Sequence, residues 1–320
     1  MRVAFMGSPE FALPALRRLI DSEHDVVGVF TQPDRPTGRG RTIAAPPVKK
    51  LALAHGLPVF QPPSISKPEA VEQLRELRPD VGVIAAYGQI LRQRVLDVPP
   101  LGVLNVHASL LPRWRGAAPI PAAILAGDAE TGATIMRVVL ALDAGPMLAS
   151  ARVPIADDDT TGTLTPKVAE AGAALLMEVL PRWARGEVDA VPQDDALATY
   201  APQIAKADAL IRWERDDAAT IARHVRAYNP WPMAHSYLDG RPLRIVEAIA
   251  IDGRFIGAPG TIVALDETRA PLGIVAASGA LGVVRVQAPG RTEVDAAAFL
   301  RGHRNIIGKR LTSESAPRSM

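Results

Sequence analysis

Two apolar runs, VGVIAAYG at residues 81–88 and GVLNVHAS at residues 102–109, decide how the first part of this chain folds. Similar short apolar runs come before and after them, and segments with a helical pattern lie between the runs. The other runs are RVAFMG (2–7), VVGVFTQ (26–32), PVFQP (58–62) and ATIMRVV (133–139), and a long helical stretch follows at 160–185. Strands that alternate with helices are typical of parallel β-α-β units. The pattern therefore predicts an α/β domain with a doubly wound, mostly parallel sheet.

The last third of the chain has a different pattern. A helix is predicted near residues 218–227, and it ends at Asn229-Pro230 because the residue before a proline disfavours helical geometry. Short strand-like runs follow, separated by turn signals such as Asp239-Gly240, Asp252-Gly253 and Ser278-Gly279. Such a series predicts a smaller antiparallel β-domain, a barrel of the OB type.

These two patterns set the expected domain boundaries. A length of 320 residues agrees with two domains. We expect a catalytic domain at residues 1–190, a linker at residues 191–207 and the OB-like domain at residues 208–314. The linker begins with a loose stretch, VPQDDALATYAPQ (191–203).

The composition excludes several classes of protein. Apolar residues make up 48% of the chain and charged residues 22%, which is ordinary for a globular protein and excludes disordered and fibrous classes. No apolar run approaches the roughly 20 residues of a membrane-spanning helix, and the first apolar stretch is too short for a signal peptide. The chain has no cysteine, which excludes disulfides, thiolate zinc sites and a cysteine nucleophile. We expect a cytoplasmic protein with no membrane partner.

The first predicted strand ends at Gly7, where a nucleotide-binding fold would place a glycine-rich turn. The run here is GSPEFA (7–12), with one glycine and the carboxylate of Glu10 in place of the three glycines that let a backbone approach a pyrophosphate. A dehydrogenase or a nucleoside triphosphatase is therefore not the expected function.

Charge is distributed unevenly, although the net charge is only +2. Residues 201–320 contain 16 basic and 12 acidic residues, which leaves 20 and 22 for residues 1–200. Residues 35–50 hold five basic residues and no acidic one. Such a segment suits contacts with phosphates, but its composition alone fits a solvated charged loop better.

Asn105 and His107 stand two residues apart at the end of a predicted buried strand, so their side chains share one face of the sheet. The carboxyl end of a parallel strand is where open α/β sheets bind ligands. A polar loop then leaves the strand through Ser109-Leu110-Leu111-Pro112. The pair fits two interpretations about equally well: a functional site, or side chains that satisfy backbone groups of the loop.

A longer set of motifs resembles the folate-dependent formyltransferases. It comprises N-x-H-x-S-L-L-P-R-W-R-G-x-x-P from Asn105 to Pro119 and Leu142-Asp143-Ala144-Gly145 after the next strand. Further blocks resemble the branch of this family that formylates methionyl initiator tRNA. They are VFTQPDRPTGRGR (29–41), VKKLALAHGLPVFQP (48–62), AAYGQIL (85–91) and AYNPWPM (227–233). The resemblance covers almost the whole chain and implies a Rossmann-like catalytic domain followed by an OB-like, tRNA-binding domain.

The resemblance implies direct transfer of a formyl group from 10-formyltetrahydrofolate to the amino group of methionyl initiator tRNA, through a tetrahedral intermediate. The amine must lose a proton, which suits a neutral histidine, and an amide can donate a hydrogen bond to the developing oxyanion. We assign proton transfer to His107, the oxyanion to Asn105 and the orientation of the histidine to Asp143, and the family implies the same three residues. No covalent enzyme intermediate and no metal is required.

The resemblance also implies the binding residues. The folate is expected in a cleft lined by residues 85–91 and by the loop before Asp143, in contact with Ser109, Leu110, Leu111, Pro112, Tyr87, Gly88 and Ile90. The tRNA is expected to contact Arg39, the position that the resemblance carries over, Arg41 in the same basic segment, and Lys206, whose place at the domain junction also fits a structural role. The protein is expected to act as a monomer.

Three other functions are weighed against this one. The chain could formylate the amine of a sugar nucleotide or hydrolyse formyl-folate, but the basic segment and the second domain favour tRNA. It could also be an RNA-binding module with an inactive catalytic fold, but the intact Asn105, His107 and Asp143 argue against that.

Overall fold

The computed structural model describes residues 1–37 and 42–314 of the chain. The chain packs as two compact units, each drawn from more than one stretch of sequence. The first comprises Met1–Pro119, Glu130–Pro154 and Thr165–Pro202, and the second comprises Ile120–Ala129, Ile155–Leu164 and Gln203–Met320. The domain boundaries expected at residues 190 and 208 stay a prediction.

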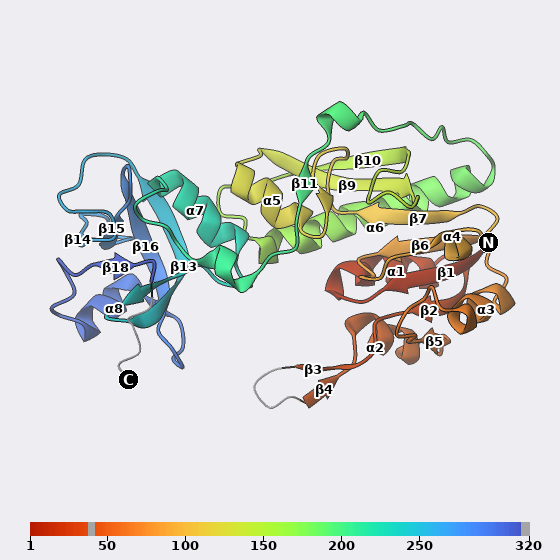
Figure 1. The fold of residues 1–320 in the computed structure, drawn as a ribbon, viewed down its shortest axis with the longest axis horizontal. Helices are drawn as coiled ribbons and strands as arrows, with labels where there is room; N and C mark the ends of the chain where they lie inside the picture. The colour runs from red at the N-terminus through yellow and green to blue at the C-terminus, as the bar shows by residue number, and fades with distance from the viewer. Residues whose placement is uncertain (38–41, 315–320) are drawn as a thin grey trace. The chain divides into compact units, whose positions relative to one another are not determined.

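The first unit is built on a seven-stranded sheet with the strand order β10-β9-β7-β6-β1-β2-β5 (Figure 1). The strands are β1 (Arg2–Gly7), β2 (Asp25–Phe30), β5 (Val59–Phe60), β6 (Val81–Ala85), β7 (Val103–His107), β9 (Glu130–Arg137) and β10 (Met147–Pro154). Five of them run parallel, whereas β9 is antiparallel to β7 and β10 is antiparallel to β9. The predicted mostly parallel α/β sheet is confirmed, and each apolar run that predicts a strand forms one.

Helices cover both faces of this sheet. They are α1 (Leu13–Ile20), α2 (Pro47–Ala54), α3 (Pro68–Glu76), α4 (Gln93–Leu96) and α6 (Thr161–Ala184), while α5 (Pro119–Ala126) precedes β9. Residues of α1, α2 and α6 pack in one apolar cluster with the sheet, and examples are Leu16, Ala52 and Leu176. Residues of α3 and α4, such as Val71 and Val95, pack in a second cluster.

Strand β7 lies between a parallel neighbour, β6, and an antiparallel neighbour, β9. Its residues Leu104 and Val106 are buried in the cluster that contains residues of α6. Because side chains alternate along a strand, Asn105 and His107 project from the opposite face. The prediction that these two polar side chains share one face is therefore confirmed by the strand that carries them.

The first unit also contains strands that the sequence pattern does not predict. One is β10, which lies at the edge of the sheet and keeps most of its residues partly exposed. Two others, β3 (Arg35–Thr37) and β4 (Thr42–Ala44), pair and project from the body of the first unit (Figure 1). The last two, β8 (Arg115–Gly116) and β11 (Tyr200–Ala201), pair in parallel. Short or edge strands bury few residues, so their apolar signal is weak.

The second unit contains a curled antiparallel sheet with the order β14-β15-β16-β13-β12-β18, and β17 pairs with β16. Its elements are α7 (Ala218–Ala227), β12 (His235–Leu238), β13 (Arg241–Ile251), β14 (Ile262–Ala264), β15 (Leu272–Val275), β16 (Ala280–Gln287), β17 (Val294–Asp295), α8 (Ala296–Gly302) and β18 (Leu311–Thr312). Backbone hydrogen bonds between residues 260–262 and 309–311 join the two ends of the sheet. This closure confirms the predicted OB-like barrel.

Two of the predicted turns connect paired strands of this barrel. Asp239-Gly240 joins β12 to β13, and Ser278-Gly279 joins β15 to β16. Asp252-Gly253 instead begins a longer connection, because β13 pairs with β16 rather than with β14.

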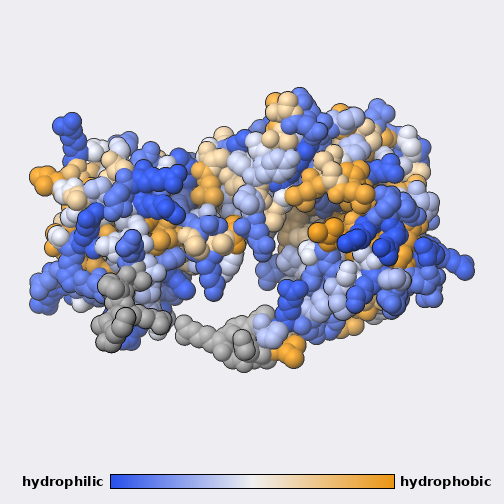
Figure 2. Space-filling view, viewed as in Figure 1, coloured by the Kyte–Doolittle hydropathy of each residue, from blue (hydrophilic) through white to orange (hydrophobic). Residues whose placement is uncertain are grey.

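The visible surface is largely hydrophilic, and apolar residues gather over part of the first unit (Figure 2). Large apolar side chains exposed in that unit include Ile90, Leu140 and Leu142. Within residues 1–37 and 42–314, no helix has both the length and the apolar character that crossing a bilayer requires.

Close packing between α6 and β7 generates a test of the fold. A Cβ atom at Gly172 of α6 would lie 2.6 Å from Cγ1 of Val106 and 3.0 Å from Cβ of Ala133. We expect Gly172→Leu to lower the free energy of unfolding by about 1–3 kcal/mol, because the larger side chain overpacks this contact. Urea unfolding followed by circular dichroism measures the change.

Gly302→Ala, at a position where a Cβ meets no atom within 4 Å, is the control and should leave stability unchanged or slightly raised. Equal stability of Gly172→Leu and the unchanged protein would contradict the close approach of α6 to β7.

Candidate active site

The strand β7 places Asn105 and His107 at the carboxyl end of the parallel part of the sheet. Asn105 pairs with Ile84 of β6 on one side and with Met136 of β9 on the other. Its side chain is partly exposed, and among the described residues its carboxamide forms no hydrogen bond. His107 is buried, with 6% of its surface exposed. The amide is therefore free to meet a ligand, whereas the imidazole is held within the protein.

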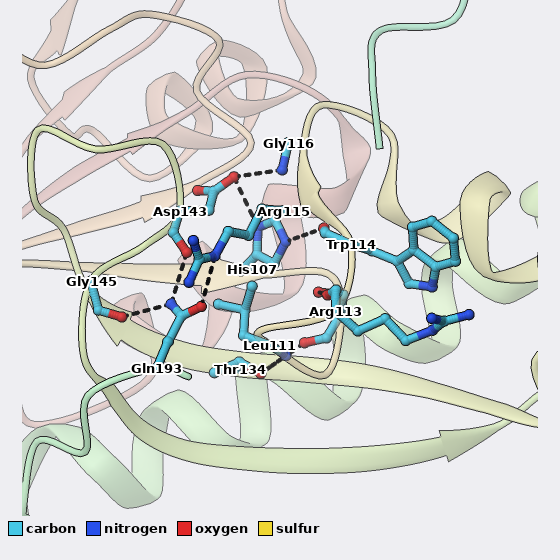
Figure 3. Close-up of polar contacts among 11 residues, drawn as sticks. His107, Leu111, Arg113, Trp114, Arg115, Gly116, Thr134, Asp143, Gly145 and Gln193 are labelled. Atoms are coloured by element: carbon cyan, nitrogen blue, oxygen red, sulfur yellow. Dashed lines mark hydrogen bonds and ion pairs between the residues drawn. The ribbon is translucent and has the colours of Figure 1, made fainter. Parts of the chain in front are cut away.

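His107 is held by two groups, one at each ring nitrogen (Figure 3). Its Nε2 lies 2.9 Å from the carbonyl oxygen of Trp114. A carbonyl can only accept a hydrogen bond, so Nε2 carries the hydrogen and Nδ1 is the basic nitrogen. Nδ1 faces Oδ2 of Asp143 at 3.7 Å, which is longer than a direct hydrogen bond.

Asp143 lies in the turn that connects β9 to β10. Its φ angle is +46°, in the left-handed region that is unfavourable for a residue with a Cβ. Its Oδ2 accepts a hydrogen bond of 2.9 Å from the backbone N–H of Gly116. A Cβ at Gly145 would overlap the carbonyl oxygen of Arg137, so the turn needs a glycine there. The motif of residues 142–145 thus forms a tight turn that directs the carboxylate toward the histidine.

The loop after β7 is fixed by a small buried network. Ser109 is fully buried, and its Oγ donates a hydrogen bond of 2.6 Å to the carbonyl of Arg113. The hydroxyl of Thr134, on β9, donates to the carbonyl of Ser109 at 2.7 Å and accepts from the backbone N–H of Leu111 at 3.2 Å. Leu110 and Pro112 are partly exposed in the same loop. This loop supplies the backbone groups that hold the imidazole and the carboxylate.

A cavity of about 250 Å³ opens next to residues 137–140, ahead of the turn that carries Asp143. It is lined by α4, by the start of β7 and by residues 137–140, which precede that turn. Leu96, Val103 and Leu140 contribute apolar walls, and Gln93 adds a polar group. The lining includes residues of the loop before Asp143 and also α4, which the sequence does not single out, but it includes none of residues 85–91.

Tyr87, Gly88 and Ile90 follow the end of β6. The ring of Tyr87 is buried in an apolar cluster, and this burial raises the pKa of its hydroxyl above the usual range. Gly88 adopts a φ of +77°, and its carbonyl accepts a hydrogen bond of 3.0 Å from the side chain of Gln32. Ile90 is 85% exposed. Of the three, Ile90 presents a side chain that a ligand can contact.

The residues expected to bind tRNA are only partly described. Arg39 and Arg41 lie outside the described residues. Lys206 is exposed at the start of a short 3-10 helix (Lys206–Ala209) in the second unit. No cluster of three or more histidine or carboxylate side chains suited to a metal ion occurs in the part of the chain that the structure describes.

Several groups in the site have no clear signal in the sequence. Trp114 and Gly116 act through backbone atoms, so the identity of their side chains does not reveal the contact. Gln193 donates from Nε2 to the carbonyls of Asp143 and Gly145, at 2.8 and 2.7 Å (Figure 3). It lies in the stretch expected to be a loose linker, and only the folded structure shows what it contacts.

Comparisons with known proteins agree with the resemblance seen in the motifs. Residues 1–180 match the formyl transferase family, and residues 203–304 match the formyl transferase C-terminal domain. Methionyl-tRNA formyltransferase of Methylococcus capsulatus is 50% identical, over 97% of this chain and 99% of that protein. The enzyme of the same name from Pseudomonas syringae is 48% identical, over 91% of each chain.

A solved structure shares the fold at low identity. HypX from Aquifex aeolicus, in complex with tetrahydrofolic acid, is similar with a TM-score of 0.64 and 19% identity, over 96% of this chain and 48% of that one. The present chain thus spans about half the length of HypX. Because both parts of the sequence match formyl transferase domains and one relative is identical at half of the aligned positions, the chain belongs to the methionyl-tRNA formyltransferase family.

Proposed function

We propose that this chain transfers the formyl group of 10-formyltetrahydrofolate to the amino group of methionyl initiator tRNA, for translation initiation. The observation that carries the proposal is the arrangement of Asn105, His107 and Asp143 in a chain that is 50% identical to a methionyl-tRNA formyltransferase. This arrangement provides a base, a paired carboxylate and a free amide donor, which are the groups that direct acyl transfer to an amine requires.

His107 is suited to take the proton that the attacking amine loses. Its Nε2–H is committed to the carbonyl of Trp114, so the proton arrives at Nδ1. The resulting imidazolium faces the carboxylate of Asp143, and both side chains are largely buried. Their attraction is stronger there than in water because the local dielectric constant is lower. A water molecule held between Nδ1 and Oδ2 would relay the proton from the amine to Nδ1, and the carboxylate stays ionised.

Asn105 is suited to stabilise the negative charge that develops on the formyl oxygen. Its side chain projects from the same strand and the same face as His107, and its amide hydrogens are not used by other described residues. A neutral amide stabilises an oxyanion without placing a second positive charge beside the imidazolium. When the tetrahedral intermediate collapses, the carbon–nitrogen bond to the folate breaks, the imidazolium returns its proton to the departing folate nitrogen, and the formyl group remains on the amine.

We assign the flat ring of the folate to the cavity next to residues 137–140. Its apolar walls include Leu96, Val103 and Leu140, and Gln93, Asp97 and Arg137 add polar groups. A pteridine ring needs apolar walls with a few polar partners. When bound, the folate supplies a formyl carbon attached to nitrogen. We assign further contacts with the folate to Ile90 and to the loop Ser109-Leu110-Leu111-Pro112, and the backbone of Tyr87 and Gly88 completes the expected set.

We propose that the side chains of Arg39, Arg41 and Lys206 contact phosphates of the tRNA. The assignment rests on the basic segment at 35–50 and on the exposure of Lys206. We propose that the enzyme acts in the cytoplasm and as a monomer.

Substitution of the two side chains on β7 tests the chemistry. We expect His107→Ala to lower kcat by roughly 100- to 10,000-fold through loss of the base. Asn105→Ala should lower kcat by about 100- to 1,000-fold, or ~3 kcal/mol, through loss of the oxyanion donor. Formyl transfer from 10-formyltetrahydrofolate to charged initiator tRNA, measured with saturating substrates, gives both values.

His55→Ala is the matched control, because His55 is an exposed histidine at the end of α2 and should leave kcat unchanged. Near-normal turnover by folded His107→Ala protein would remove the histidine from the mechanism.

The acceptor itself is tested with three amines in one assay. We expect formyl transfer to methionyl initiator tRNA, and kcat/KM at least 100-fold lower for free methionine and for an amino-sugar nucleotide. The physical reason is that only the tRNA offers phosphates to the basic residues. Efficient formylation of the sugar amine, or release of formate without an acceptor, would favour a different member of the superfamily.

The salt dependence of tRNA binding tests the basic residues. We expect Arg39→Ala and Lys206→Ala each to raise KM for tRNA and to reduce the slope of log KM against log salt concentration by about 1, since each loses one phosphate contact. KM for the folate should not change. Arg17→Ala, an exposed arginine on α1, is the control. An unchanged slope would remove the substituted residue from the RNA site.

A further inference from the structure

Residues 191–201, which we call the strap, form hydrogen bonds with both loops that position His107 and Asp143. At one end, Val191 and Met147 exchange backbone hydrogen bonds of 2.8 and 2.9 Å at the start of β10. At the other end, β11 pairs with β8, and the hydroxyl of Thr199 accepts a hydrogen bond of 2.9 Å from the backbone N–H of Trp114. The strap therefore joins the loop after β7 to the turn after β9.

Gln193 is the point where the strap meets the turn of Asp143. Its Nε2 donates to the carbonyl oxygens of Asp143 and Gly145, and its Oε1 accepts a hydrogen bond of 2.9 Å from Nε of Arg115 (Figure 3). Both amide hydrogens and the amide oxygen are thus used. One of the two carbonyls belongs to Asp143, the residue at φ +46°, and the other lies two residues further along, so the glutamine braces the part of the turn whose conformation is least favourable.

Arg115 gives Gln193 a rigid support. Its side chain is 3% exposed, and its Nη2 forms a bond of 2.7 Å with Oδ1 of Asp195, also in the strap. Burial by itself lowers the pKa of Arg115, but hydrogen bonds to Asp195 and Tyr200 outweigh it and leave the pKa above its ordinary value. The guanidinium therefore stays charged and fixed, and it holds the glutamine oxygen in one orientation.

We propose that Gln193 is a positioning residue for formyl transfer. It contacts neither the substrates nor the reacting atoms. It holds the backbone of Asp143 so that the carboxylate faces Nδ1 of His107, and it ties this turn through Arg115 to the loop that anchors Nε2. The inference rests on the proposed function, because the geometry it maintains is that of the proposed proton transfer.

Substitution of Gln193 measures this role. We expect Gln193→Ala to lower kcat by roughly 10- to 100-fold, while KM for the folate and for the tRNA changes by less than about threefold. Gln193→Glu keeps the size of the side chain and an acceptor for Arg115 but loses the two amide donors, so it should lower kcat similarly. Leu197→Ala, an exposed side chain on the same strap, is the matched control and should keep normal kcat.

A double-mutant cycle separates positioning from a general structural role. If Gln193 acts through Asp143, adding Gln193→Ala to Asp143→Ala should change kcat by less than about twofold. If the fold-decrease in kcat of the double variant equals the product of the two single decreases, the proposal is overturned. Normal kcat in Gln193→Ala and in Gln193→Glu would overturn the proposal as well. If Gln193→Ala does not fold, the cycle is run with Gln193→Glu instead.

The unchanged protein is assayed beside the variants. If the unchanged protein transfers the formyl group and the Gln193 variants do so at a normal rate, only the proposed role of Gln193 is wrong. Absence of formyl transfer by the unchanged, folded protein removes the proposed function and, with it, the inference.

Discussion

The hydrogen bond between Nε2 of His107 and the carbonyl of Trp114 is the constraint on which the site depends. A histidine can carry its hydrogen on either ring nitrogen and can rotate about two bonds. The carbonyl removes this freedom, because it fixes both the hydrogen and the plane of the ring. The basic nitrogen is then directed at Asp143, and the arrangement follows from a backbone group. The backbone of Trp114, at φ +63°, matters to this bond more than its indole does.

The rest of the site is built to hold that geometry in place. The strand β7 is rigid because its alternate residues are buried against α6. The two loops around the imidazole lack such support and are held by hydrogen bonds from Thr134, Gly116 and Gln193. Two of these three bonds end on a backbone carbonyl of a loop. Asn105 and His107 are thus carried by a packed sheet, while the orientation of His107 and Asp143 depends on polar contacts between segments distant in sequence.

The parts that sequence predicts well are those whose burial is continuous. Runs such as residues 3–7 and 81–85 are apolar throughout because both faces of an inner parallel strand are covered, and each lies in a strand of the structure. The edge strand β10 has no such signal, since most of its residues are partly exposed. The barrel strand β13 could be predicted because its 11 residues include a largely apolar stretch, whereas the strand β18 has only two residues.

The residues of the candidate site also differ in how far the sequence predicts them. Asn105 and His107 are predictable because two residues that stand two positions apart on one strand must share a face. Asp143 needed the family resemblance, since its position depends on how the turn after β9 folds back. Gln193 is a polar residue in a polar stretch, and its partner at Asp143 is 50 positions away, so no local pattern marks it. Contacts that arise only from tertiary structure are the ones that sequence reasoning misses.

The strap also bears on how such a protein can be divided or recombined. A designer who reads residues 191–207 as a spacer would join a foreign accessory domain at residue 190. That junction would discard β11 and the glutamine that braces the turn after β9, although every side chain assigned to chemistry would still be present. A catalytic domain that keeps these contacts therefore has to extend through Ala201, and a domain fusion should place its junction after the strap.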